Sequence, residues 1–77
     1  QFHQEEPNIA WVSDITYIWT LEGWLYLAAF LDLFSRILAG WDVSDTLDAT
    51  MCVRAFERSV ARRRPSPGLL VHSDRGC

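Results

Sequence analysis

The chain has 77 residues, a net charge of −3 at neutral pH and 49% hydrophobic residues, including four tryptophans. The negative charge gives no global attraction to nucleic acid or to an anionic membrane, and no apolar run reaches the roughly 20 residues of a transmembrane helix. Two cysteines are too few for a disulfide framework and lack the spacing of a metal site, so we expect a protein of the reducing cytoplasm.

The first predicted element is a strand. Residues 1–8 are polar and contain Pro7-Asn8, which indicates a lead-in segment. The following Ile9–Trp19 is rich in β-branched and aromatic residues, which is typical of a strand. Side chains alternate across a strand. The alternation predicts one face with Val12, Asp14, Thr16 and Ile18, and a second face with Trp11, Ser13, Ile15, Tyr17 and Trp19.

Two further strands are predicted to follow through short connections. Thr20–Gly23 has the composition of a tight turn. Trp24–Phe34 is apolar at both parities, as a central strand covered on both faces would be. Ser35-Arg36 interrupts the apolar pattern, and Ile37–Val43 resumes it as a third strand. Short connections join antiparallel neighbours, so we expect an antiparallel meander.

The hydrophobic period then changes to that of a helix over Thr46–Arg64. Asp45, Thr46 or Asp48 can cap its start. Arg62–Arg64 at its end complement the helix dipole, and prolines follow directly. One apolar stripe at helical spacing is expected to face the core: Ala49, Cys52, Val53, Phe56 and Val60.

Gly68–His72 is predicted to be a fourth strand. A strand that follows a crossover helix tends to run parallel to an earlier strand. The expected fold class is therefore α/β, with a three-stranded antiparallel meander, a crossover helix and a fourth strand parallel to the first. This topology brings Asp74, just after the fourth strand, toward Asp14 on the first. Two neighbouring carboxylates repel unless a cation lies between them, and oxygen ligands suit Mg²⁺ or Mn²⁺.

Five segments carry a family resemblance. Together they resemble the integrase-type catalytic core of bacterial insertion-sequence transposases, whose fold is ribonuclease H-like. The segments are WVSDITYI at 11–18, EGWLYLAA at 22–29, LDLFSR at 31–36, AGW at 39–41 and HSDRG at 72–76. The resemblance implies that residues 9–77 are the N-terminal part of such a core, truncated, after a lead-in of residues 1–8.

The resemblance also implies a catalytic site. In the family, two aspartates and a glutamate bind two divalent ions, Mg²⁺ or Mn²⁺; Asp14 matches the first acid and Asp74 the second. The third acid has no counterpart in these 77 residues, so we expect this chain alone to be inactive. The intact parent is expected to be an oligomeric, cytoplasmic DNA transposase that binds element ends and target DNA, not a membrane, and performs metal-dependent strand cleavage and strand transfer.

Several polar residues near this site have two interpretations. Asp32 is a candidate third acidic ligand, but a hydrogen bond to Ser35 or Arg36 at the strand end is favoured. His72 shares parity with Asp74 and is a candidate neighbour of the site, although a hard cation prefers oxygen ligands. Arg75 is a candidate DNA phosphate contact or a solvated turn residue.

Other features favour the simpler of two interpretations. Arg62–Arg64 are interpreted as complementing the helix dipole rather than as a phosphate patch. The aromatic residues are expected in the core rather than stacked on bases: Trp19, Trp24, Tyr26, Phe30 and Trp41. Two alternative functions stay open: a non-catalytic remnant, and a ribonuclease H-like nuclease of another branch. The Asp14 and Asp74 motifs together favour the transposase.

Overall fold

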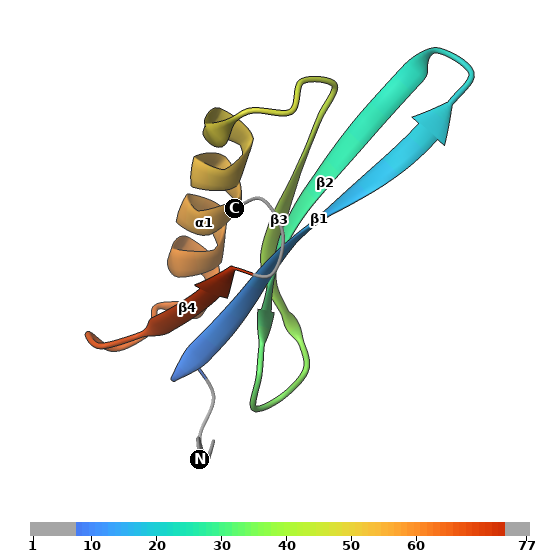
Figure 1. The fold of residues 1–77 in the computed structure, drawn as a ribbon. Coiled ribbons are helices and arrows are strands. Elements are labelled where there is room, and N and C mark those ends of the chain that lie inside the picture. Colours follow the sequence, from blue (N-terminus) through green and yellow to red (C-terminus); the bar gives the residue numbers. More distant parts are fainter. Residues whose placement is uncertain (1–7, 74–77) are drawn as a thin grey trace.

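The computed structural model describes residues 8–73, which form one four-stranded sheet with a helix on one of its faces (Figure 1). The elements in chain order are β1 (Ala10–Thr20), β2 (Gly23–Asp32), β3 (Leu38–Ser44), α1 (Ala49–Arg63) and β4 (Leu70–Ser73). The strand order is β3-β2-β1-β4. β1 pairs with β2 and β2 with β3 in antiparallel fashion, whereas β4 pairs with β1 in parallel. The predicted α/β topology is confirmed and agrees with a partial ribonuclease H-like fold.

The hairpin of β1 and β2 turns at Leu21 and Glu22, as predicted, and Gly23 takes a φ of 117° that favours glycine. The Thr20 hydroxyl donates to the Gly23 carbonyl at 2.6 Å and accepts from the Glu22 amide at 3.2 Å. At its other end β2 stops at Asp32, two residues before the predicted end. The reason is local, because the Asp32 carboxylate accepts from the Phe34 amide and turns the chain there.

Of the three predicted caps, the structure uses Asp48. Its carboxylate accepts a hydrogen bond from the Met51 amide at 3.2 Å, so α1 begins at Ala49, three residues later than predicted. The helix ends at Arg63 because Arg64 adopts the left-handed conformation, with its amide bonded to the Val60 carbonyl at 2.8 Å. This left-handed closure is a common helix terminus.

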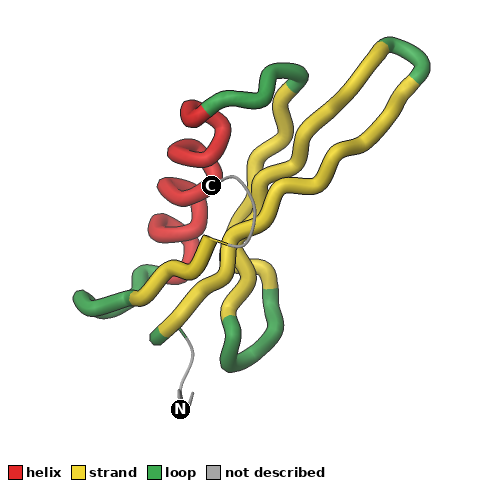
Figure 2. The backbone as a smooth tube through the Cα atoms, viewed as in Figure 1, coloured by secondary structure: helices red, strands yellow, loops and turns green. Residues whose placement is uncertain are grey.

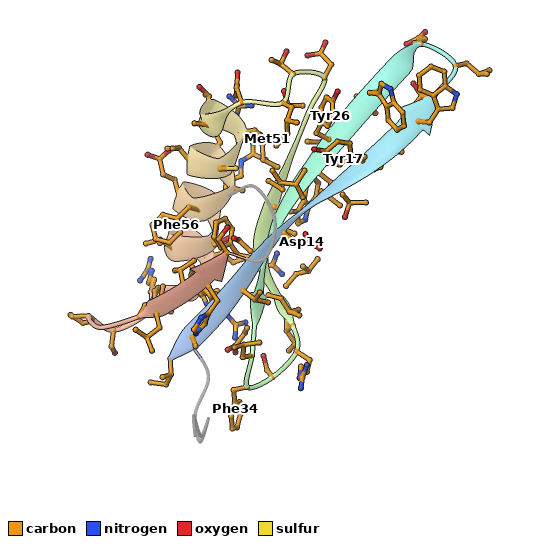
Figure 3. The ribbon with its side chains drawn as sticks, viewed as in Figure 1. Asp14, Tyr17, Tyr26, Phe34, Met51 and Phe56 are labelled. Carbon is orange, nitrogen blue, oxygen red and sulfur yellow. The ribbon has the colours of Figure 1, made fainter. Side chains whose placement is uncertain are left out.

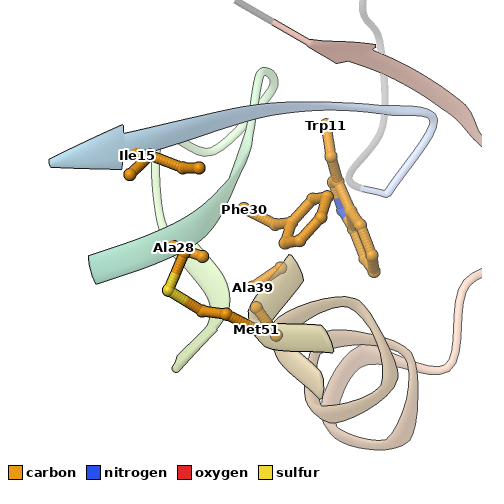
Figure 4. Close-up of a cluster of buried hydrophobic side chains, with 7 residues drawn as sticks. Trp11, Ile15, Ala28, Phe30, Ala39 and Met51 are labelled. Atoms are coloured by element: carbon orange, nitrogen blue, oxygen red, sulfur yellow. The ribbon is translucent and has the colours of Figure 1, made fainter. Parts of the chain in front are cut away.

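The core lies between α1 and the sheet face beneath it (Figure 4). Trp11 is fully buried, and its ring contacts Phe30 and Phe56 with centroids 6.2 and 6.1 Å apart. The buried cluster is Trp11, Ile15, Ala28, Phe30, Ala39, Met51 and Ala55, with Tyr26, Cys52, Phe56 and Leu69 packed against it. Alternation along β1 is as predicted, since Trp11, Ser13 and Ile15 are buried on this side.

The predicted apolar stripe of the helix is wrong in part. The buried residues of α1 are Met51, Ala55 and Ser59, whereas Val53 and Val60 are exposed. Ser59 keeps its hydroxyl satisfied by donating to the Ala55 carbonyl at 2.7 Å. The helix therefore faces the sheet through Met51, Ala55 and Ser59, and of the predicted stripe only Cys52 and Phe56 pack against the core.

The close approach of helix and sheet depends on Gly40. A Cβ added there would lie 2.8 Å from both the backbone N and Cα of Ser59 and would overlap its Oγ. We predict that Gly40→Ala lowers the free energy of unfolding by about 1–3 kcal/mol, because backbone atoms must move apart. Urea denaturation followed by far-UV circular dichroism measures this. Ser59→Ala, which removes one internal hydrogen bond, should cost about 1 kcal/mol; an unchanged stability of Gly40→Ala contradicts the packing.

A second link between helix and sheet is ionic. Asp42 of β3 is buried, and its carboxylate binds Arg54 Nε at 2.9 Å and Arg58 Nη1 at 3.3 Å. Arg54 and Arg58 are not among the residues of the predicted apolar stripe, and both reach Asp42 on the sheet. Their charges are thus partly neutralised within the domain.

The second face of the sheet has a different environment. The tube in Figure 2 shows β1, β2 and β3 side by side with α1 on one side only. β2 is central, as predicted, but among the described elements only α1 covers one of its faces. Trp41 and Val43 on the far face are 45% and 42% exposed. Within residues 8–73, no helix has the length and apolar character needed to cross a membrane.

Candidate active site

Asp14 lies near the middle of β1 on the face away from α1 (Figure 3). Its neighbours Ser13 and Ile15 are buried beneath the helix, so alternation exposes Asp14 on the other face. Its Oδ1 accepts a hydrogen bond from the Ile15 amide at 2.9 Å. None of the ion pairs within residues 8–73 involves Asp14. The Asp14 carboxylate is therefore accessible from the sheet face away from α1.

Trp41 is the residue near Asp14 that sequence analysis assigned wrongly. The register pairs Asp14 with Ala29 and Ala29 with Trp41, so the three share one row of the exposed face. Trp41 is 45% exposed rather than in the predicted core, and the same prediction is wrong for Trp19 and Trp24, which are 64% and 49% exposed. Asp42 next to it faces the helix and binds Arg54, so alternation sends Trp41 to the other side of the sheet.

β4 runs beside β1 on the side opposite to β2. The register pairs Val12 with His72 and Ser13 with Ser73, and the Ser13 hydroxyl donates to the His72 carbonyl at 3.5 Å. His72 is exposed, and its pairing with Val12 puts it on the sheet face of Asp14. The predicted parallel approach of the fourth strand to the first is confirmed.

Asp74 and Arg75, the predicted second acid and DNA contact, lie outside the described residues. The described ladder reaches Ser13 and Ser73, which directly precede Asp14 and Asp74 in the chain. The proximity of the two aspartates thus stays a prediction that rests on the confirmed register of β1 and β4.

Asp32 does not belong to this site. It is fully buried and pairs with Trp11, so it lies on the helix side of the sheet. Its Oδ2 accepts from the Ser35 hydroxyl at 2.8 Å, which confirms the favoured interpretation. Its Oδ1 accepts from the Asn8 and Phe34 amides, each at 3.2 Å. Asp32 is therefore excluded as a partner of Asp14 in metal binding.

The charge of Asp32 is stabilised where it lies. Burial by itself would raise the pKa of its carboxyl group, but the hydrogen bonds from Ser35, Asn8 and Phe34 outweigh burial and lower that pKa below its ordinary value. Arg63 Nη2 is 3.7 Å from Oδ2. Arg63 Nε also donates to Asn8 Oδ1 at 3.2 Å, and Trp11 Nε1 donates to the same oxygen at 3.1 Å. Arg63 therefore links the end of α1 to Asn8 and Asp32, in addition to complementing the helix dipole.

The described residues supply one of the metal ligands that were predicted. No group of three or more histidine, cysteine, aspartate or glutamate side chains within residues 8–73 comes together to hold an ion. Asp14 supplies an accessible carboxylate on the sheet face away from α1, the kind of hard oxygen ligand that Mg²⁺ and Mn²⁺ prefer. The described part thus accommodates the first predicted ligand.

The mixed sheet, the crossover helix and the exposed carboxylate on β1 are the features expected of a partial ribonuclease H-like domain. The sequence model of the integrase core domain matches residues 4–77. The chain belongs to the integrase core domain family.

Known relatives of the chain are transposases. It is 43% identical over 75 residues to transposase InsF for insertion sequence IS3A of Escherichia coli K12. The aligned residues make up 97% of the chain and 26% of that transposase. It is 41% identical over 75 residues to the transposase for insertion sequence element IS904 of Lactococcus lactis subsp. lactis IL1403, with 97% and 30% covered. The chain thus spans less than a third of the length of these relatives. No solved structure matches it.

Proposed function

We propose that the chain forms the first part of the catalytic core of a DNA transposase, in which Asp14 and Asp74 bind divalent metal ions. The observation that carries this proposal is the accessible Asp14 carboxylate on β1, beside a parallel β4 whose register reaches Ser73. The similarity to transposases supports it. The reaction would be cleavage of DNA at the element ends and transfer of the freed strand to target DNA, in the cytoplasm.

The residues of the chain would act by positioning charge. The Ile15 amide fixes one oxygen of Asp14, and β2 holds the backbone at Asp14 while β4 holds it as far as Ser13. Asp14 and Asp74 would together supply the carboxylates, with Arg75 as a contact to a DNA phosphate and His72 as a neighbour. Bound Mg²⁺ or Mn²⁺ would contribute charge neutralisation at the reacting phosphodiester. Oligomerisation and the absence of a membrane partner are part of the proposal.

The charges of the domain favour DNA binding through cations held by the carboxylates rather than through its own basic side chains. Arg54 and Arg58 are held by Asp42, and Arg63 lies beside Asp32, so these basic side chains are engaged within the domain. A chain with net charge −3 has no general attraction to DNA. Cations bound at Asp14 and Asp74 would therefore be the main attraction for phosphates at this face.

The proposed cation site is testable on the chain without any DNA. We predict that Mn²⁺ broadens the amide resonances of Ile15 and Ala29, because the effect of a paramagnetic ion falls steeply with distance. Asp14→Asn should weaken this binding at least about tenfold, since a charged ligand is lost. Asp45→Asn, an exposed aspartate outside the sheet, is the matched control and should bind normally. Broadening centred on Asp45 and Asp48 instead would contradict the site.

A further inference from the structure

Among the described strands, β4 has the least buried side chains. All four of its residues are exposed, and Leu70 and Val71 are 46% and 44% exposed. The strand lies at the edge of the sheet beside β1 (Figure 1). The position of a strand along its neighbour is firmly specified where one face of the strand is buried. Burial of its own side chains therefore does little to fix β4 against β1.

The start of β4 is anchored by contacts of the backbone and of the preceding residue. The Leu70 amide donates a hydrogen bond to the Ile9 carbonyl at 2.9 Å. Leu69, directly before the strand, packs against the buried core cluster. These contacts hold the first residues of β4. Its other end, at His72, comes two residues before Asp74 and depends on a different contact.

That contact is made by Ser13 of β1. Ser13 is fully buried, and its hydroxyl donates to the His72 carbonyl at 3.5 Å. The bond is long, but a hydroxyl that is shielded from water is costly to leave without a partner. Moving the end of β4 away from β1 would leave the Ser13 hydroxyl unsatisfied. Because Ser13 lies on the helix side of the sheet, the contact leaves the face of Asp14 open.

We propose that Ser13 is a positioning residue of the metal site, because its hydroxyl holds the end of β4 against β1 and thereby sets the spacing of Asp14 and Asp74. This inference rests on the proposed function, in which the two aspartates bind the ions. Each aspartate directly follows a residue of the last described pair, Ser13 and Ser73. Mg²⁺ binds its oxygen ligands at about 2.1 Å, whereas one strand residue spans about 3.3 Å. A shift of β4 by one residue would therefore separate the two ligands.

Ser13→Ala in the 77-residue chain tests this role against a matched buried serine. Mn²⁺ binding, followed by broadening of the Ile15 amide resonance, should weaken about fivefold, which corresponds to the loss of one hydrogen bond. Ser59→Ala is the control, since Ser59 is also fully buried and donates to the Ala55 carbonyl within α1. Urea denaturation should show similar losses of stability in both variants, whereas Mn²⁺ binding should weaken in Ser13→Ala alone.

A second pair of variants separates the hydroxyl from the size of the side chain. Threonine and valine are both β-branched and differ in the hydroxyl, so any crowding is common to Ser13→Thr and Ser13→Val. Ser13→Thr should bind Mn²⁺ about fivefold more tightly than Ser13→Val. Hydrogen exchange at the His72 amide should be about fivefold faster in Ser13→Val than in Ser13→Thr, while the Leu70 amide keeps its rate.

The outcomes separate the role of Ser13 from the metal site itself. Equal Mn²⁺ affinity in Ser13→Ala and the unsubstituted chain, or in Ser13→Thr and Ser13→Val, would overturn the positioning role. An equal loss in Ser59→Ala would also overturn it, because Mn²⁺ binding would then follow stability alone. Asp14→Asn tests the proposed function: if this variant binds Mn²⁺ as tightly as the unsubstituted chain, the metal site is wrong. Unchanged binding in Ser13→Ala beside a loss in Asp14→Asn removes the role of Ser13 alone.

Discussion

Asp14→Asn is expected to reduce DNA strand transfer by about 100-fold or more. The assay uses a chimera in which the chain replaces the 75 residues of the IS3A transposase that it matches. Asparagine keeps the size of the side chain but removes the negative charge, so a divalent ion would be held weakly and misplaced. Misplacement at a reacting centre costs on the order of 100-fold in rate. Transfer of labelled element-end DNA to target DNA, with Mg²⁺ or Mn²⁺, gives the rate.

Two further variants make this result specific. Asp74→Asn should produce a similar loss, because it is the proposed second ligand. Asp45→Asn should leave the rate within about twofold, since Asp45 is exposed in the loop before α1 and its carboxylate accepts a hydrogen bond from the Thr46 hydroxyl. Full activity of the Asp14→Asn chimera would remove Asp14 from the catalytic site, and an inactive unsubstituted chimera would count against the proposed function.

Asp32→Ala is expected to lower the free energy of unfolding by about 3 kcal/mol. The substitution leaves the Asn8 and Phe34 amides and the Ser35 hydroxyl without their acceptor, and each unsatisfied buried donor costs about 1–3 kcal/mol. Arg63 loses its neighbouring carboxylate at the same time. Urea denaturation at neutral pH measures the effect. Asp48→Ala, which removes one helix cap, is the comparison and should cost about 1 kcal/mol.

The same carboxylate predicts a dependence on pH. Because the pKa of Asp32 is lowered in the folded state from its ordinary 3.8, its ionised form stabilises the fold at pH values above 3.8. This contribution is lost as the pH falls from there through the folded pKa. Asp32→Asn should therefore flatten the loss of stability below about pH 4 relative to the unsubstituted chain. A parallel acid profile in both proteins would show that Asp32 is not a stabilising charge.

Local sequence patterns determined most of the architecture. Alternation along β1 correctly divided Trp11 from Asp14, and the glycine at position 23 marked the hairpin turn. The change to a helical period, bounded by Asp48 and the prolines after Arg64, located the crossover helix to within three residues. The rule for crossover connections then gave the parallel pairing of β4 with β1. The strand, turn and helix boundaries follow from interactions between residues close in the chain, whereas the pairing of β4 with β1 follows from the handedness of crossover connections.

The motif around Asp14 was also readable from sequence, since it depends on residue identity and order rather than on packing. The same alternation predicted that Asp14 lies on the face opposite to Trp11 and Ser13, and the structure shows that this face is the exposed one at Asp14. Its partner Asp74 is predicted from the motif HSDRG and from the strand order, and the register of Ser13 with Ser73 is the structural support for that pairing.

Only the tertiary structure decided which apolar surfaces are covered. Val53 fits a helical stripe as well as Met51 does, but α1 packs through Met51, Ala55 and Ser59 because Gly40 lets the backbones approach there. The sequence likewise does not show that α1 leaves Tyr17, Trp19 and Trp24 of the hairpin exposed. The hydrophobic period of a helix or strand depends on residues close in the chain. Whether its apolar side chains are buried depends on the length and position of an element distant in the chain.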